Sequence, residues 1–278
     1  MTAVAPEPPP PDDPPAPTGA EAWAPWSAPT ALLTALILSF VGGLTVVIAA
    51  QAGGVDVTEG DTPPGILLAS TAVQDVAFVV VAIAFARMTG PVFAEQFGLR
   101  PTRLWPAVGA VVATYIGFAV LVSLWGLLVG DPDEPLLDDL GVDESTLLLV
   151  LGIVTVCIGA PLVEELFFRG FFFRALRNRL SLPVAAAATG VIFGVMHLIS
   201  SPIEAILPLA LFGALLCVLY ERTGSLYPCI ALHAINNSLA FGLNEDMGGA
   251  TALLVVASLA GCGAIAWAAA RRWRPAPA

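Results

Sequence analysis

Eight apolar stretches run through this chain, each close to the roughly 20 residues that cross a lipid bilayer as a helix. They cover approximately residues 29–51, 64–86, 105–129, 145–168, 183–200, 203–221, 227–243 and 250–270. Hydrophobic residues make up 57% of the sequence and charged residues 12%, which excludes an ordinary soluble protein. We therefore expect an all-α, polytopic transmembrane helix bundle of about eight spans in the cell membrane.

Residues 1–25 differ from the rest of the chain because they are rich in proline and acidic side chains. Such a segment buries too little apolar surface to offset the entropy of ordering it. We predict a disordered tail there, followed by a transmembrane helical domain over residues 26–274. No basic residue precedes the first apolar stretch, so we expect an uncleaved first span rather than a signal peptide.

The basic residues predict the orientation of the bundle, and all eleven of them are arginine. Arg169 lies at the end of the fourth apolar stretch, whereas the others lie in alternate loops and after the last stretch. The remaining loops are acidic, so the positive-inside rule places both termini in the cytoplasm. The net charge of −11 arises from these loops and the tail. No nucleic-acid partner is expected, and the sequence makes no prediction of the oligomeric state.

Ionisable side chains inside apolar helices are candidates for function, because each costs at least ~2.5 kcal/mol to insert into a bilayer. The chain has two histidines, and both fall within apolar stretches. The ionisable residues within the predicted spans are Asp75, Glu164, Glu165, His197, Glu204 and His233, accompanied by the amides Gln74, Asn236 and Asn237.

Local spacing predicts different roles for the two neighbouring glutamates of the fourth stretch. Glu165 lies four residues before Arg169, the favourable order for an ion pair within a helix. Glu164 has alanine four residues before it and Phe168 four residues after it. Glu165 is therefore expected to brace the helix, whereas the unpaired Glu164 suits a general acid or base.

The same four-residue spacing organises two other helices. Phe193 lies one turn before His197 and is expected to pack against the imidazole, while His233 and Asn237 share one helix face. Counting residues from the expected helix ends places Glu164, His197 and His233 roughly 10 Å below the cytoplasmic surface. We therefore expect a site that is accessible from the cytoplasmic side.

Three short motifs on three of these stretches resemble those of a known family. They are EELFFR at 164–169, FGVMH at 193–197 and HAINN at 233–237. Together they resemble the CPBP family, the CAAX-type and bacteriocin-processing membrane proteases that are also called Abi proteins or type II CAAX prenyl endopeptidases. The similarity covers about residues 145–243, and three motifs in this order on separate helices form a specific signal.

The resemblance implies a glutamate-dependent intramembrane endopeptidase that acts on a peptide or a membrane-associated protein. Glu164 would act with His197 to activate a water molecule, and His233 and Asn237 would stabilise the tetrahedral oxyanion. The supporting residues would be Glu165, Arg169 and Phe193. Two other functions remain open: a non-catalytic membrane scaffold or immunity protein that keeps the motifs for folding, and a proton-coupled transporter that uses Asp75 in a relay.

No cofactor is expected, because the chain lacks the His-Glu-x-x-His motif that binds zinc from one helix face. The alternative is a catalytic zinc ion held by Glu164, His197 and His233. The four cysteines lie in separate apolar stretches without Cys-x-x-Cys spacing, so neither disulfides nor a zinc knuckle is predicted.

Overall fold

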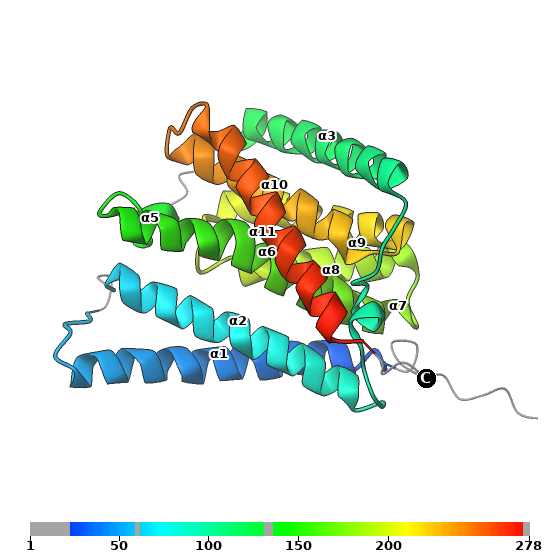
Figure 1. Cartoon of the computed structure of the whole chain (residues 1–278), viewed down its shortest axis with the longest axis horizontal. Coiled ribbons are helices and arrows are strands. Elements are labelled where there is room, and N and C mark those ends of the chain that lie inside the picture. The colour runs from blue at the N-terminus through cyan, green and yellow to red at the C-terminus, as the bar shows by residue number, and fades with distance from the viewer. Residues whose placement is uncertain (1–22, 59–61, 131–135, 275–278) are drawn as a thin grey trace, which may run out of the picture.

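The computed structural model describes residues 23–58, 62–130 and 136–274, which form a bundle of helices (Figure 1). Within these ranges the regular secondary structure is helical, and the predicted all-α fold is confirmed. Residues 1–22 of the predicted tail lie outside the described residues.

Every predicted apolar stretch forms a helix. The elements outside the fourth stretch are α1 (Ser27–Ala52), α2 (Pro64–Arg87), η2 (Ala94–Phe97), α3 (Leu104–Val129), α4 (Leu136–Asp139), α8 (Leu182–Met196), α9 (Ile203–Thr223), α10 (Leu226–Asn244) and α11 (Ala250–Arg272). Among the described residues, six helices are long and apolar enough to cross a membrane. α8 is shorter, and the histidine and asparagines of α10 lower its hydropathy, so eight complete spans stay a prediction.

The fourth stretch forms a continuous helical rod of 32 residues, Thr146–Arg177. Its parts are α5 (Thr146–Ile153), η3 (Val154–Gly159), α6 (Ala160–Glu164), η4 (Glu165–Phe173) and α7 (Arg174–Arg177), of which η3 and η4 are π-helical. The apolar stretch predicted from the sequence ends near residue 168, and the helix continues beyond it to Arg177. Arg169 is completely buried within η4, where an ion pair with Glu165 compensates its charge.

Pro161 explains part of the irregular winding of this rod. Proline has no backbone N–H, so the carbonyls four and five residues earlier, in Cys157 and Val156, lose their usual helical donor. Both carbonyls find partners on other helices instead. The Asn237 side-chain amide of α10 donates to the Val156 oxygen at 2.9 Å, and the Cys262 thiol of α11 lies 3.8 Å from the Cys157 oxygen.

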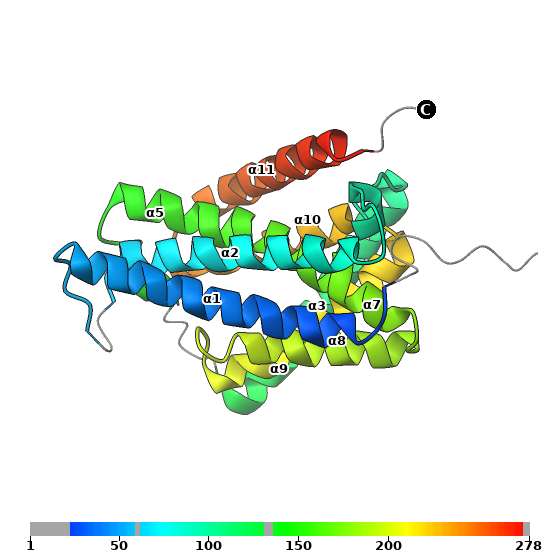
Figure 2. The same cartoon turned by 90° about the horizontal axis from the view of Figure 1, so that it is seen from below.

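Helices α8 and α9 form a closely packed hairpin (Figure 2). Gly190 and Gly194 form a Gly-x-x-x-Gly motif, the small-residue pattern that lets two membrane helices approach closely. A Cβ atom at Gly194 would lie 2.6 Å from the Ile206 carbonyl oxygen, and one at Gly213 would lie 2.9 Å from the Phe193 Cβ. The glycines therefore set the distance at which α9 packs against the helix that carries Phe193.

The two ends of the bundle differ in charge. What we call the arginine end consists of the helix ends and loops that carry Arg87, Arg100, Arg103, Arg174, Arg177, Arg179, Arg222, Arg271, Arg272 and Arg274. It is the end from which the C-terminus leaves in Figure 1. What we call the acidic end carries Asp56, Asp138, Asp139, Asp143, Glu144, Glu245 and Asp246. Which side of a membrane each end faces stays a prediction.

An aromatic core fills the half of the bundle next to the arginine end. The Trp23 ring centroid lies 5.3 Å from that of Phe97 and 5.2 Å from that of Phe171, and the three side chains are almost completely buried. Aromatic pairs at such distances add to the stabilisation that burial alone provides. This packing leaves the interior more open toward the acidic end.

Candidate active site

The ionisable and amide residues that the sequence singled out, except Glu165 and Glu204, line one cavity of about 530 Å³ inside the bundle. Glu164 reaches it from the end of α6, His197 from the residue after α8, and both His233 and Asn237 from α10. Asp75 of α2 lines the same cavity. The four proposed catalytic side chains and one further carboxylate thus share a single space.

Glu165 lies behind this cavity and joins three helices. Its Oε1 atom accepts a hydrogen bond from Arg169 Nη1 at 2.7 Å and another from His233 Nδ1 at 2.8 Å. Arg169 Nη2 donates to the Gly213 carbonyl of α9 at 2.9 Å. The predicted ion pair between Glu165 and Arg169 is therefore confirmed, whereas the sequence did not reveal His233 as the second partner of Glu165.

His233 is held between the two neighbouring glutamates. Glu165, ionised beside Arg169, can only accept a hydrogen bond, so the Nδ1 atom of His233 carries the proton of that contact. The other ring nitrogen, Nε2, lies 3.9 Å from Oε2 of Glu164. The Phe212 ring lies 5.5 Å away and limits how the imidazole can tilt. His233 therefore presents Nε2 to the carboxylate in the cavity.

His197 is oriented by its own helix. Its Nδ1 atom lies 2.7 Å from the Phe193 carbonyl oxygen, which can only accept, so Nδ1 carries a proton. In the neutral imidazole the other nitrogen, Nε2, is then a proton acceptor. The two ring centroids of Phe193 and His197 lie 4.8 Å apart, which confirms the predicted packing of the aromatic ring against the imidazole.

Phe193 contacts more of the site than the sequence predicted. The Arg169 guanidinium lies 4.7 Å from the centre of its ring, and the His233 ring lies 6.0 Å from it. Phe193 therefore packs between the buried ion pair and both imidazoles, so its position affects the whole site.

Two carboxylates face the cavity. The Glu164 side chain is 24% exposed, and its Oε2 atom accepts no hydrogen bond from any described residue. Asp75 packs against the π-helical segment η3, where a Cβ atom at Gly159 would lie 3.5 Å from Asp75 Oδ2. Glu164 therefore brings a carboxylate to the wall of the cavity, with the buried Oε2 atom beside His233.

The amide of Asn237 has a structural partner as well as a place in the cavity. It donates to the Val156 carbonyl at 2.9 Å, and its own oxygen lies 3.4 Å from the Asn236 amide nitrogen. One N–H of the carboxamide is therefore engaged in holding α10 against η3, and the second N–H is the one that can serve a substrate.

Across residues 23–58, 62–130 and 136–274, no group of three His, Cys, Asp or Glu side chains is arranged to hold a metal ion. The contact of His233 with Glu165 uses Nδ1, as the outer-shell contact of a metal-bound histidine would, so zinc stays an alternative that the arrangement does not test. The four cysteines are buried and unpaired, as their scattered positions predicted.

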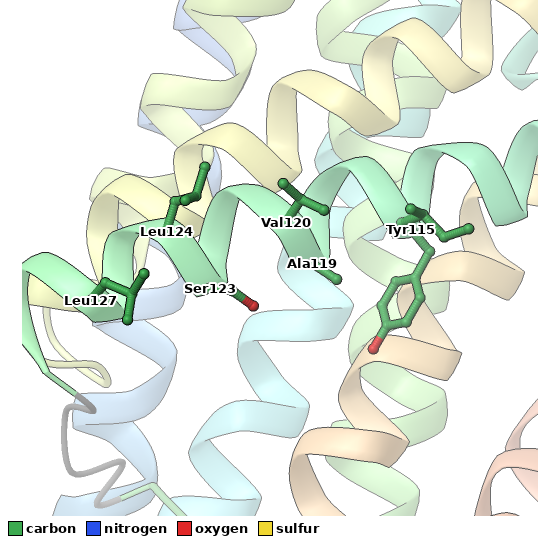
Figure 3. Close-up of a pocket in the computed structure, with 7 residues that line it drawn as sticks. Tyr115, Ala119, Val120, Ser123, Leu124 and Leu127 are labelled. Carbon is green, nitrogen blue, oxygen red and sulfur yellow. The ribbon is translucent and has the colours of Figure 1, made fainter.

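A second hollow lies on the outer face of α3 and has a volume of about 340 Å³ (Figure 3). It is lined by Tyr115, Ile116, Ala119, Val120, Ser123, Leu124 and Leu127, all from this one helix. Its lining is apolar apart from two hydroxyl groups. Such a surface suits contact with lipid and offers no acid or base for chemistry.

The fold and the cavity define a helical membrane protein with a carboxylate and imidazole site inside its bundle. Residues 146–239 match the sequence model described as "Type II CAAX prenyl endopeptidase Rce1-like". The match includes Glu164, His197, His233 and Asn237 and excludes Asp75. This segment is therefore Rce1-like, and the resemblance to the CAAX-type membrane proteases is confirmed.

Two curated proteins are similar to part of this chain. An "Uncharacterized 24.3 kDa protein" of Escherichia coli is 32% identical over 139 residues, which are 49% of this chain and 62% of that protein. The "Putative membrane peptidase YdiL" of Bacillus subtilis (strain 168) is 27% identical over 136 residues, which are 49% of this chain and 53% of that protein. The chain thus spans between half and two thirds of the length of both relatives. No solved structure matches the chain.

Proposed function

We propose that this protein is an intramembrane endopeptidase that hydrolyses a peptide bond in a peptide or a membrane-associated protein. The observation that supports this most strongly is the Glu164 carboxylate, whose Oε2 atom lacks a hydrogen-bond partner among the described residues and which lines the same cavity as two oriented imidazoles. The Rce1-like match over this segment and the name of the Bacillus subtilis relative agree with the proposal.

In the proposed mechanism, Glu164 removes a proton from a water molecule whose oxygen attacks the peptide carbonyl carbon. His197 orients this water through Nε2, the acceptor nitrogen of the tautomer that its contact with Phe193 selects. When the C–N bond breaks, the leaving amine takes the proton from Glu164. The reaction needs no metal ion in this scheme, because the carboxylate and the imidazole share the activation of water.

The oxyanion of the tetrahedral intermediate would be stabilised by His233 and Asn237. When doubly protonated, His233 offers Nε2–H to the cavity while Nδ1–H stays bonded to Glu165. Asn237 offers the carboxamide N–H that is not bonded to Val156. A fixed donor in a site that excludes most water contributes about 3 kcal/mol to lowering the barrier.

The proposal is tested with protein purified in detergent and a library of quenched fluorescent peptides. We expect Glu164→Gln and His197→Ala each to lower the cleavage rate by about 100-fold or more. Glu95→Gln is the matched control, because Glu95 is exposed at the arginine end and lies outside the cavity. Cleavage that persists in both site variants contradicts the mechanism. Complementation of a deletion phenotype by Glu164→Gln would favour the scaffold hypothesis instead.

A further inference from the structure

The cavity is closed toward the arginine end and open toward the acidic end. On the closed side it is lined by Phe78, Phe168, Phe193 and Phe212, which are buried in the aromatic core. On the open side it is lined by Leu137 and Leu140 of α4, by residues 199–201 after α8, and by the exposed Asn244 at the end of α10. A molecule that enters the cavity therefore arrives from the acidic end.

Helix α8 ends early on this open side. Its 15 residues rise about 22 Å, less than the ~30 Å of a bilayer's hydrocarbon core, and it starts three residues after Arg179. The turn at residues 197–202 therefore lies within the depth of the membrane. Irregular backbone at that depth is tolerated where it lines a water-filled cavity. Residues 199–201 line this cavity, and Ile199 at the tip is fully exposed.

The rim of this opening is strongly negative. Burial and the neighbouring charge and hydrogen bond of Asp143 raise the pKa of Glu245, and Asp138 and Asp246 add to the effect. The acids that precede α5 and those that follow α10 thus meet at one place, beside the lining residues Leu140 and Asn244. Ten of the eleven arginines lie at the opposite end, and Arg169 is buried.

We propose that the substrate is a peptide segment with basic residues flanking an apolar stretch that contains the scissile bond, which enters from the acidic end past the turn at residues 197–202. This inference rests on the proposed endopeptidase function and names the substrate class of that site. A negative rim at the mouth of a low-dielectric cavity attracts cationic segments and repels acidic ones. If the arginine end faces the cytoplasm, as the positive-inside rule predicts, this route differs from the predicted access from the cytoplasmic side.

The charge preference is tested with two pools of quenched fluorescent peptides that share a degenerate apolar centre. One pool is flanked by three lysines and the other by three glutamates. At low ionic strength we expect the lysine pool to be cleaved about tenfold faster. The double variant Asp143→Asn with Glu245→Gln should narrow this difference at least threefold. The control double variant Glu95→Gln with Glu221→Gln removes the same charge at the arginine end and should leave the difference intact.

The route is tested with a bulky maleimide on single introduced cysteines, which the four buried native cysteines permit. Relative to its own unmodified rate, labelled Ile199→Cys should lose at least tenfold in cleavage, because the adduct obstructs the mouth. Labelled Arg179→Cys, at the arginine end, should keep its rate. Full labelling at position 199 without loss of cleavage overturns the route.

The outcomes separate this inference from the proposed function. If the wild type cleaves neither pool faster than Glu164→Gln does, the endopeptidase proposal fails. If it cleaves both pools equally, or prefers the glutamate pool, the endopeptidase stands and the basic substrate class is wrong. If the preference survives in the Asp143→Asn and Glu245→Gln variant, the role of the acidic rim is wrong.

Discussion

Arg169 and Glu165 place two full charges in the core of the bundle, with side chains that are 0% exposed. Removing one partner of a buried pair leaves the other charge uncompensated, which costs about 3–5 kcal/mol. We expect Arg169→Ala to lower the thermal unfolding midpoint in detergent strongly, and to disturb His233 because Glu165 holds that ring as well.

The control is the surface pair of Arg177 and Glu221, whose side chains are 36% and 33% exposed. Exposed pairs contribute about 0–1 kcal/mol, so Arg177→Ala should shift the midpoint little. Equal shifts for the two variants would show that the buried pair does not stabilise the fold. Replacing Arg169 and Glu165 together by apolar residues should restore part of the midpoint while activity stays lost.

The sequence correctly predicted the contacts in the site between residues that lie four positions apart. Both Glu165 with Arg169 and Phe193 with His197 are neighbours on one helix, so helical geometry alone brings them together. The contact between Glu165 and His233 joins residues 68 positions apart. Hydropathy and spacing do not show which face of one helix turns toward another helix. The sequence therefore could not reveal the contact between Glu165 and His233.

At the scale of elements, the close packing of α8 against α9 determines where Phe193 and His197 lie. We expect Gly194→Ala to destabilise the protein by about 1–3 kcal/mol and to lower the cleavage rate, because the new methyl would meet the Ile206 carbonyl and push the helices apart. The measurements are the unfolding midpoint and the rate on one library peptide.

Gly117→Ala provides the matched control on α3, where an added Cβ would meet no atom within 4 Å. It should be neutral or slightly stabilising, since alanine favours a helix over glycine. If both variants behave alike, the contact at Gly194 does not position the site. The Gly-x-x-x-Gly pattern was visible in the sequence, although only the structure shows which helix it contacts.

Pro161 shows why the irregular winding of the fourth span could not be predicted from the sequence. Apolar composition sets the approximate extent of a helix, but the π-helical segments on either side of α6 depend on which carbonyls find partners on other helices. Those partners, Asn237 and Cys262, lie on α10 and α11.

For the whole molecule, the distribution of charge was predicted from the sequence more fully than the shape of the cavity. Arginine positions along the chain already separate two sets of loops, and the folded bundle gathers each set at one end. The direction in which the site opens depends instead on where α8 stops and where aromatic side chains fill the interior. Residue counting from helix ends gave a depth for the site, but it carried no information about which helices close the interior at either end.

The end of the bundle at which the cavity opens does not determine which side of the membrane that end faces. Cysteine labelling in intact cells determines the side. The positive-inside rule places the arginine end in the cytoplasm. A membrane-impermeant maleimide should therefore label Asp143→Cys, an exposed position at the acidic end, in intact cells. It should label Arg179→Cys only after the cells are permeabilised. The reverse pattern would place the acidic rim in the cytoplasm, so that substrate would enter the same mouth from inside the cell.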